Sequence, residues 1–335
     1  MLSRTADNLF WMCRYLERAE NTARMLEVNL QMSLLPHDPQ ARDGLWRAVL
    51  RISELETAFD AAYPATTPQD ILHFMVRDPA NPSSIYSCLR NARENARSVR
   101  GNLTTELWET YNQTWLELQR HLRERYPERH PGEFFEWVKF RSQVARGVTV
   151  GTMLADESLC FQRLGIHLER ADNTARLLDI KFHEQADLKA AHDAMEQRQT
   201  SNETEPALLE RAGSAHSEFY RWSAILGSVS ALETYRKVYR DVISADRVAE
   251  LLILRADMPR SLVASVNAVA DDLAQLRNDR SGETERRAGM LAAELRYARI
   301  ETILDDGLHP FLDRFLQRIN DLGNRISEDF LVPLA

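Results

Sequence analysis

Glycine and proline are scarce in this sequence, with 12 of each among 335 residues. Both counts fall below average usage. A β-rich protein or a Rossmann-like protein of this length needs more turn glycines, so the composition argues against both classes. The hydrophobic residues, 44% of the chain, are nevertheless enough to build a large core.

Other features are also missing, and each absence narrows the functional class. The net charge of −8 and the pI near 5.7 argue against a general nucleic-acid-binding protein. No apolar run reaches the length of a membrane span, and the charged N-terminal region does not fit a signal peptide. The three cysteines, Cys13, Cys88 and Cys160, form no Cys-x-x-Cys motif, which fits a reducing compartment. We therefore expect a soluble, cytoplasmic protein.

No familiar catalytic or cofactor-binding motif occurs. The phosphate-binding loop, the dinucleotide-binding glycine pattern, the nucleophile elbow and the His-Glu-x-x-His zinc motif are all missing. A ferritin-like metal bundle needs Glu-x-x-His on two helices, and no histidine here follows a glutamate by three residues. We therefore predict no metal site and no cofactor, assign no catalytic residue, and lean against an enzyme.

Helical periodicity is what the sequence has in abundance. Residues 2–34 contain neither Gly nor Pro, and their apolar residues form one stripe at 100° per residue. Trp11 and Met25 fall on the opposite side, so we expect this helix to be central in a bundle. Further helices are expected at 42–61, 84–100, 105–125, 133–148, 155–184, 206–239, 245–254, 261–278, 284–304 and 308–321.

A polar phrase occurs twice, half the chain apart. "LERAENTARMLEVN" at 16–29 and "LERADNTARLLDIK" at 168–181 match at 9 of 14 positions. Two weaker echoes follow in the same order, 46–57 with 222–234 and 77–85 with 255–262.

Three echoes in one order predict an internal duplication. The predicted fold is an all-α bundle of two halves, 1–150 and 151–335, which form one compact unit around a pseudo-twofold axis. The helices at 2–34 and 155–184 should lie at its centre. The polar stretch 183–206 is interpreted as a solvated helix end followed by a mobile linker.

The repeated phrase supplies the candidate site residues. Glu17, Asn21 and Arg24 share one side of the first helix next to its apolar stripe, whereas Arg18 points away, on the side of Trp11. Within each copy an acidic residue precedes an arginine by four positions, the favourable orientation for an intrahelical pair. The candidates are Glu17, Arg18, Asn21, Arg24, Glu169, Arg170, Asn173 and Arg176.

Two interpretations of this motif stay open. In the structural one, Glu17 and Arg18 take part in buried ion pairs that fix how the two duplicated helices cross. In the functional one, the two copies form a charged cavity for a small anionic or peptide-like ligand.

A second group of arginines repeats at spacings of three and four. Arg90, Arg93, Arg97 and Arg100 fall on one helix face, where arginine could bind carboxylate or phosphate. The ordinary interpretation is a solvated or salt-bridged face, with Glu94 within reach of Arg97 or Arg90.

Four segments together resemble the alpha-E family, which is named for a predicted all-helical domain with a Glu-Arg motif. These are "LSRTADNLFWMCRYLERAENTAR" at 2–24, "NPSSIYSCLRNARENARSVR" at 81–100, "TTELWETYN" at 104–112 and "LERADNTARLLD" at 168–179. The resemblance extends from Leu2 to about Leu331. It maps the Glu-Arg motif onto Glu17-Arg18 and Glu169-Arg170.

The resemblance also implies a functional context. Genes of this family typically adjoin those for circularly permuted ATP-grasp proteins and transglutaminase-like proteases. The implied function is that of an accessory protein in an ATP-grasp-type system that forms peptide or amide bonds. The protein would dock the ligase or hold its peptide-like substrate, and either neighbour could be its partner.

Two other functions stay open. One is an enzyme that acts on a peptide or an amino-acid conjugate, with Glu17 or Glu169 as general base. That role requires a raised carboxylate pKa and an accessible cleft. The other is a helical scaffold that only binds protein. We expect no nucleic-acid or membrane partner, and a homo-oligomer stays open.

Overall fold

The computed structural model describes residues 1–34, 39–198, 219–220 and 222–331. These residues form helices and no strand, which confirms the predicted all-α class. The helices before residue 153 are α1 (Ser3–Ser33), α2 (Pro39–Ile52), α3 (Glu56–Ala62), α4 (Pro68–Val76), α5 (Ile85–Ser98), the 3-10 turn η1 (Arg100–Asn102), α6 (Thr105–Arg123), α7 (Tyr126–Arg129) and α8 (Pro131–Thr152). Those after it are α9 (Glu157–Arg198), α11 (Leu232–Tyr239), α12 (Ala245–Ile253), α13 (Leu262–Gln275), α14 (Gly282–Tyr297), α15 (Ile300–Asp305) and α16 (Leu308–Phe330).

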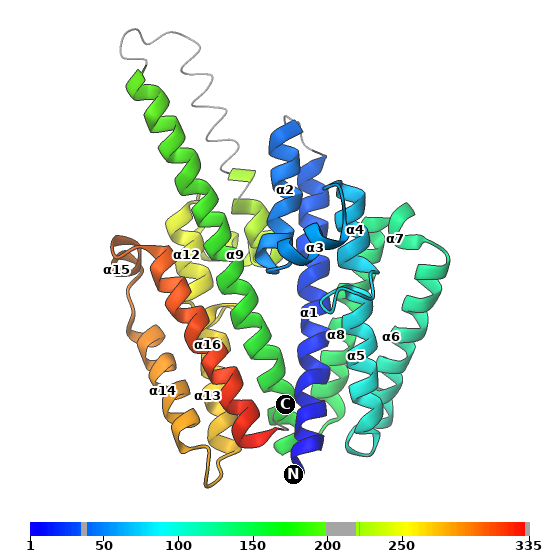
Figure 1. Cartoon of the computed structure of the whole chain (residues 1–335). Helices are drawn as coiled ribbons and strands as arrows, with labels where there is room; N and C mark the ends of the chain where they lie inside the picture. Colours follow the sequence, from blue (N-terminus) through cyan, green and yellow to red (C-terminus); the bar gives the residue numbers. More distant parts are fainter. Residues whose placement is uncertain (35–38, 199–218, 221, 332–335) are drawn as a thin grey trace.

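Helices α1 and α9 lie at the centre of the bundle, as predicted (Figure 1). Helix α1 contacts α2, α5, α8, α9 and α16. Its buried residues lie on every side of the helix, and they include Phe10, Met25 and several polar side chains. Because a helix with neighbours all round cannot expose a polar face, its charged residues must find partners inside the core.

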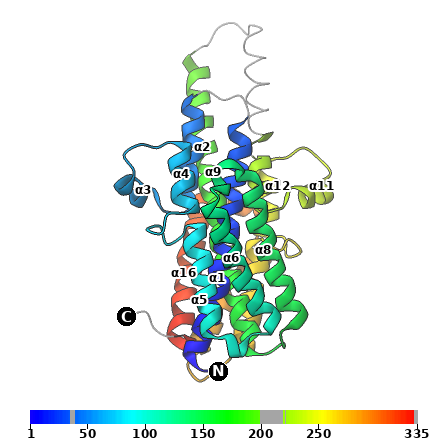
Figure 2. The same cartoon turned by 90° about the vertical axis from the view of Figure 1, so that its right-hand side faces the viewer.

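Each central helix has its own set of companions. Helices α5 and α8 pack on α1 with α6 behind them, while α13 and α16 pack on α9 with α14 behind them (Figures 1 and 2). The duplication, the twofold relation and the division into 1–150 and 151–335 stay predictions. The division falls inside α8, two residues before its end at Thr152.

The two central helices approach most closely at Gly165. A Cβ atom at this position would lie 2.3 Å from the carbonyl oxygen of Phe10 and 3.2 Å from the amide nitrogen of Arg14. Real Cβ atoms do not come so close to backbone, so only glycine fits here without moving a helix. This contact places α9 backbone directly against α1, one turn from each Glu-Arg motif.

Several predicted helix boundaries are wrong, and the reasons are local. The helix expected at 42–61 is two helices, because Glu54 takes a left-handed conformation with φ of 55°. Ser230, with φ of 53°, likewise breaks the segment expected at 206–239, of which 206–218 and 221 lie outside the described residues. Extended backbone at Ala298 and Arg299 separates α14 from α15, where one helix was expected at 284–304.

Two helices are longer than expected. Helix α16 continues to Phe330 instead of ending near 321. Helix α9 continues to Arg198, which corrects the helical end of the stretch 183–206. The remainder of that stretch, 199–206, lies outside the described residues.

Several helices begin at a serine or threonine, the residue types that favour helix N-caps. Thr104 and Ser84 act as N-caps, because each side chain accepts a hydrogen bond from a backbone N–H in the first turn. Ser244 occupies the N-cap position of α12 but makes no such bond. Ser261 caps α13, since its side chain accepts a hydrogen bond from the N–H of Ala264.

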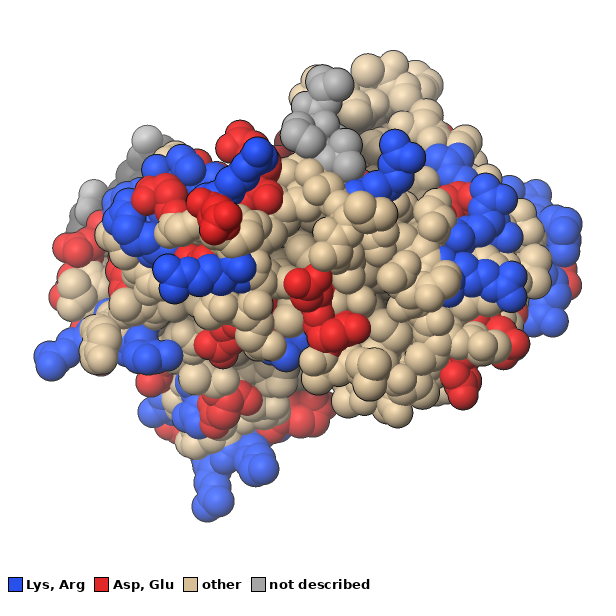
Figure 3. All heavy atoms as spheres, turned by 90° about the horizontal axis from the view of Figure 1, so that it is seen from below, with Lys and Arg blue, Asp and Glu red and all other residues tan. Residues whose placement is uncertain are grey.

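Exposed apolar side chains gather at the lower end of the bundle, where α8 ends and α9 begins. Leu2, Val150 and Leu154 expose 79%, 82% and 78% of their surface. Figure 3 views this end and shows a broad area with few charged side chains near its centre. No described helix combines the length and the apolar character that a membrane crossing requires.

Candidate functional site

The two Glu-Arg motifs bind each other across the α1–α9 interface. Arg18 donates two hydrogen bonds to Glu169, at 2.6 Å from Nε and 2.9 Å from Nη2. Arg170 donates from Nε to Glu17 at 2.9 Å. The glutamate of each motif therefore accepts the arginine of the other motif. These are buried ion pairs at the helix crossing, as the structural interpretation of the motif expects.

The direction of the Arg18 side chain differs from the expectation. Its side chain does lie on the side of Trp11, but this side faces α9 and not away from the core. Arg14 reaches the same carboxylate, with Nε 2.8 Å from Glu169. The aromatic rings of Trp11 and Tyr15 lie beside these two guanidinium groups.

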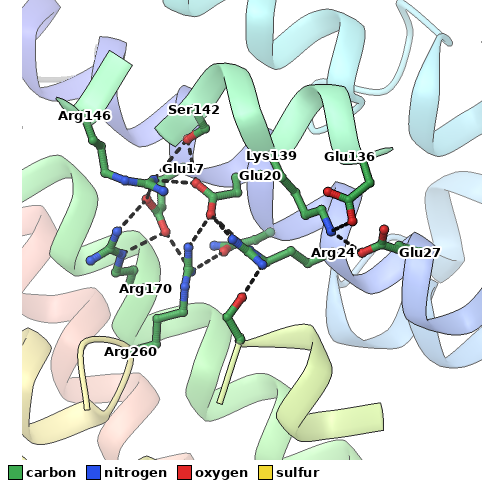
Figure 4. A network of polar contacts seen from close by, with 12 residues as sticks. Glu17, Glu20, Arg24, Glu27, Glu136, Lys139, Ser142, Arg146, Arg170 and Arg260 are labelled. Carbon is green, nitrogen blue, oxygen red and sulfur yellow. Dashed lines mark hydrogen bonds and ion pairs between the residues drawn. The ribbon is translucent and has the colours of Figure 1, made fainter. Parts of the chain in front are cut away.

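Glu17 also receives arginines from outside the motifs. Nη1 of Arg146, on α8, lies 3.0 Å from its carboxylate. Nη1 of Arg260, in the turn between α12 and α13, lies 2.8 Å away. Two helices, α8 and α9, and the turn before α13 thus bring three arginines to one glutamate of α1 (Figure 4).

Glu20, one turn after Glu17, collects a similar shell. It accepts hydrogen bonds from Arg24 and Arg260, each at 2.7 Å, from Ser142 at 2.6 Å and from Arg146 (Figure 4). Arg146 and Arg260 therefore bridge the two glutamates of α1. We call Glu17, Glu20 and Glu169 with their arginines the buried cluster.

Positive charge exceeds negative charge in the buried cluster. Three carboxylates serve six guanidinium groups, those of Arg14, Arg18, Arg24, Arg146, Arg170 and Arg260. The carboxylates of Glu17 and Glu20 are 1% and 0% exposed. Because each buried carboxylate is shared by two or more arginines, removing one carboxylate leaves several buried cations without their partner.

The electrostatics keep the three glutamates ionised. Burial alone would raise the pKa of Glu17, but the charges of Arg170, Arg260 and Arg146 outweigh it and lower the pKa. The same balance of burial against arginines lowers the pKa of Glu20. For Glu169, burial is outweighed by Arg18 and Arg14, and the pKa falls to about 2.

A general base needs the opposite properties. Its pKa should lie near the working pH, and it must reach a substrate proton. The cavity beside Glu17, bordered by Cys13, Tyr111 and Arg146, has a volume of only about 10 Å³, enough for about one water molecule. The geometry therefore does not favour Glu17 or Glu169 as a catalytic base.

Two further ion-pair groups extend the buried cluster at its edges. Lys139 contacts Glu27 at 2.5 Å and Glu136 at 2.8 Å (Figure 4). On α9, Arg176 donates to Asp172 from Nε at 2.8 Å and from Nη2 at 3.0 Å. Both intrahelical pairs expected from the repeat, Glu20 with Arg24 and Asp172 with Arg176, are thus present.

The two motif asparagines occupy different surroundings. Asn21 is buried and accepts a hydrogen bond from Arg260 at 2.8 Å, while its Nδ2 has no partner among the described residues. Asn173 is half-buried and makes none of the ion pairs or hydrogen bonds described above for the buried cluster. Instead Thr174, the next residue, donates to the carbonyl oxygen of Arg260 at 3.0 Å.

The arginine stripe of α5 lies apart from the buried cluster and packs on aromatic rings. Arg93 and Arg100 lie over Trp108 of α6, at 5.7 and 5.4 Å from the ring centroid. Arg90 lies over Tyr86 at 5.6 Å. Such cation–π contacts use the guanidinium faces for packing.

Glu94 serves this stripe as an internal counter-ion. Its carboxylate pairs with Arg97 at 3.0 Å and with Arg93. Arg90 does not bind it and instead donates to Asn91 at 3.4 Å. This arrangement fits a salt-bridged face more closely than an open anion site.

Sequence reasoning missed three arginines and one serine of the buried cluster. Arg14 precedes Arg18 by one helical turn, so the helical period of α1 could have placed both arginines on the same face. Arg260 lies in the segment 255–262 that echoes 77–85, although nothing in the echo marks an arginine as functional. Arg146 and Ser142 belong to α8, and no motif points to them.

Among the described residues, no group of three or more His, Cys, Asp or Glu side chains could hold a metal ion.

Comparison with known proteins places this architecture in a family. The Alpha-E family, described as a predicted alpha-helical domain with a conserved ER motif, matches residues 1–331. Similar proteins include an uncharacterized protein of Mycobacterium bovis and an uncharacterized protein of Mycobacterium tuberculosis, each 26% identical over 339 aligned positions. These alignments cover 95% of this chain but 35% of each relative, so the chain spans about a third of the length of the curated relatives it matches.

No solved structure matches the chain. The family match, by contrast, includes both Glu-Arg pairs at the α1–α9 interface and every described residue. The chain belongs to the Alpha-E family.

Proposed function

We propose that this protein is the accessory subunit of an ATP-grasp-type ligase that forms peptide or amide bonds. The observation that carries the proposal is the length of the relatives. A region equivalent to this chain forms about a third of each relative, so in those proteins it is covalently joined to a much longer polypeptide. A domain that is joined to another polypeptide in one protein commonly contacts a separate partner in another.

The identity of the partner rests on the family resemblance. Genes for such proteins typically adjoin those for circularly permuted ATP-grasp proteins and transglutaminase-like proteases. The ATP-grasp protein is the partner we propose first, because it would supply the chemistry that this chain lacks. The system would work in the cytoplasm, where ATP is available.

The buried cluster supports an accessory function over an independent catalytic one. Glu17 and Glu169 are paired and sealed from solvent, and their pKa values are lowered. In the proposed function the buried cluster sets the angle between α1 and α9, and thereby the shape of the surface that the ligase meets.

The lower end of the bundle is the first surface to test for this contact. Val150 and Leu154 expose their apolar side chains there, and few charged groups lie near its centre (Figure 3). Exposed apolar area of this kind commonly marks a protein interface. Val242, 71% exposed and remote from this end along the chain, offers a chemically matched control.

The decisive experiment is co-purification of the tagged chain with the ATP-grasp protein encoded beside it. We expect a stoichiometric complex by size-exclusion chromatography with light scattering. We also expect faster ATP-dependent ligation when this chain is added to the ligase. Val150→Glu should weaken the complex at least tenfold if the lower end is the interface, whereas Val242→Glu should leave it unchanged.

Two results would contradict the proposal. One is the absence of any complex with the ATP-grasp protein at micromolar concentrations of both chains. The other is ligation at the same rate with and without this chain. A stable complex with only the transglutaminase-like protein would keep an accessory function but replace the partner.

A further inference from the structure

A cavity of about 220 Å³ lies at the junction of α1, α9 and α16. It is separate from the small space beside Glu17. Its walls combine apolar residues, an arginine, an aspartate and uncharged polar groups: Phe10, Trp11, Arg14, Leu168, Asp172, Ile319, Asn320, Gly323, Asn324, Ser327 and Leu331. The volume is below the usual range for drug-sized ligands, so any natural occupant should be small.

Arg14 presents unused hydrogen-bond donors to this cavity. Its Nε binds Glu169 at 2.8 Å, but Nη1 and Nη2 have no hydrogen-bond partner among the described residues. The guanidinium lies over Trp11, 5.1 Å from the ring centroid, and the side chain is only 17% exposed. Stacking and the bond to Glu169 hold the group in place, so its free donors are preorganised for an anion.

The charge balance of the buried cluster strengthens this preference. Glu169 is shared by Arg14 and Arg18, so neither guanidinium has a carboxylate of its own. An anion in the cavity would supply the missing negative charge beside Arg14. A carboxylate suits the two parallel N–H donors that remain on this arginine.

The same cavity also contains a group of opposite charge. The carboxylate of Asp172 binds Arg176, and in the described part of the chain no ion pair joins it to Arg14. Each of its oxygens can accept a further hydrogen bond. One small cavity thus offers a cation and an anion that do not neutralise each other.

Helix α16 lines the opposite wall with polar groups. Asn320, Asn324 and Ser327 follow one helix face at i, i+4 and i+7. Their side chains make no hydrogen bond to another described residue. Both asparagines are exposed. Such groups can bind the amide and the charged ends of a small peptide.

We propose that this cavity binds a zwitterionic α-amino acid or dipeptide. The ligand's carboxylate accepts hydrogen bonds from Nη1 and Nη2 of Arg14, and its ammonium group lies toward Asp172. The asparagines and Ser327 bind the remaining polar atoms, and Trp11 and Leu168 cover the apolar part. This inference rests on the cavity alone and does not require the proposed ligase partner.

The test uses isothermal titration calorimetry on the full chain with four probes. Glycylglycine carries both charges, glycylglycinamide lacks the carboxylate, N-acetylglycylglycine lacks the ammonium, and inorganic phosphate is an unrelated anion. We expect glycylglycine to bind and the amide to bind at least about tenfold more weakly, because it loses the charge-assisted bonds to Arg14. The acetylated peptide should be weakened less, because Asp172 keeps its bond to Arg176.

A matched pair of variants locates the binding. Gly323 faces Arg14, since a Cβ there would lie 3.9 Å from Nη1, so Gly323→Leu fills the cavity without a backbone clash. Gly289, on α14, has nothing within 4 Å and lies outside the cavity, so Gly289→Leu is the control. Leucine suits a helix better than glycine at both positions. Glycylglycine binding should be lost in Gly323→Leu and kept in Gly289→Leu.

A second variant guards against a folding defect. Asn324→Asp places a negative charge on the exposed rim, where it should weaken binding severalfold with no change in melting temperature. The proposal is overturned if glycylglycine does not bind at millimolar concentration. It is also overturned if the amide or phosphate binds equally well, or if Gly323→Leu binds like Gly289→Leu. Failure here with an intact ligase complex would leave the proposed function standing.

Discussion

Replacing Glu20 by glutamine tests whether the buried cluster holds the core together. Glu20 is fully buried and its carboxylate accepts hydrogen bonds from Arg24, Arg146, Arg260 and Ser142. Glutamine keeps the size of the side chain and one acceptor. It loses the charge, and its NH₂ group then faces guanidinium donors. Three arginines must then share Glu17 or remain uncompensated.

The expected loss follows from this geometry. Removing one member of a buried ion pair typically costs about 3–5 kcal/mol. Since Glu20 contacts three arginines and the shape of the side chain is conserved, we expect a loss of about 4 kcal/mol. For a chain of 335 residues this corresponds to a Tm lower by about 6 °C.

Thermal unfolding by circular dichroism, repeated in urea at pH 7, measures this loss. Glu301→Gln is the control, because Glu301 is exposed and should change stability by less than about 0.5 kcal/mol. Adding Arg260→Met to Glu20→Gln should recover part of the loss, because it removes an unmatched cation. Equal melting of Glu20→Gln and Glu301→Gln would refute the reasoning.

Three further predictions concern pH and packing. The pKa of Glu169 is lowered from 4.5 to about 2. Its contribution of about 3 kcal/mol to the free energy of unfolding should therefore be present above pH 4.5 and be lost as the pH falls toward 2. Urea titrations of Glu169→Gln should show a flatter pH dependence than those of the parent. Burial raises the pKa of Asp272 from 3.8 to about 7. The stability of the fold therefore falls as the pH rises through that range, because the buried carboxyl must ionise. Asp272→Asn should therefore be more stable than the parent by roughly 2–4 kcal/mol at pH 8 and equal to it near pH 4, and equal stability at pH 8 would rule this out. Gly165→Ala should lower stability by about 3 kcal/mol or more through its clash with the Phe10 carbonyl, whereas Gly147→Ala, with open space around it, should be neutral or stabilising by up to about 1 kcal/mol in the same melting assay.

The sequence predicted the central helices well, because their physical signals are local. Residues 2–34 have a continuous helical period without a breaker, and α1 spans Ser3–Ser33. The pairs four residues apart were equally accessible, since both partners lie on one helix. By contrast, the breaks at Glu54 and Ser230 occur at left-handed residues that are not glycine. Nothing in their side chains marks such a conformation.

The partners of the motif could be predicted only in part. That Glu17 and Arg18 form buried pairs follows from a charged phrase on a central helix. Which residues they bind depends on the register between α1 and α9, which Gly165 helps to fix. Arg146, on α8, and Arg260, in the turn before α13, lie more than 100 residues away in sequence. These contacts depend on how the helices pack in the folded bundle, and no periodic pattern in the sequence marks the two arginines.

The central claim is that the two Glu-Arg motifs join α1 to α9 by binding each other. A double-mutant cycle on Arg18→Met and Glu169→Gln measures this directly through the free energy of unfolding. We predict a coupling energy of about 2 kcal/mol or more, because Glu169 accepts two hydrogen bonds from Arg18 inside the core. Additive single losses, with a coupling energy below about 0.5 kcal/mol, would contradict the claim.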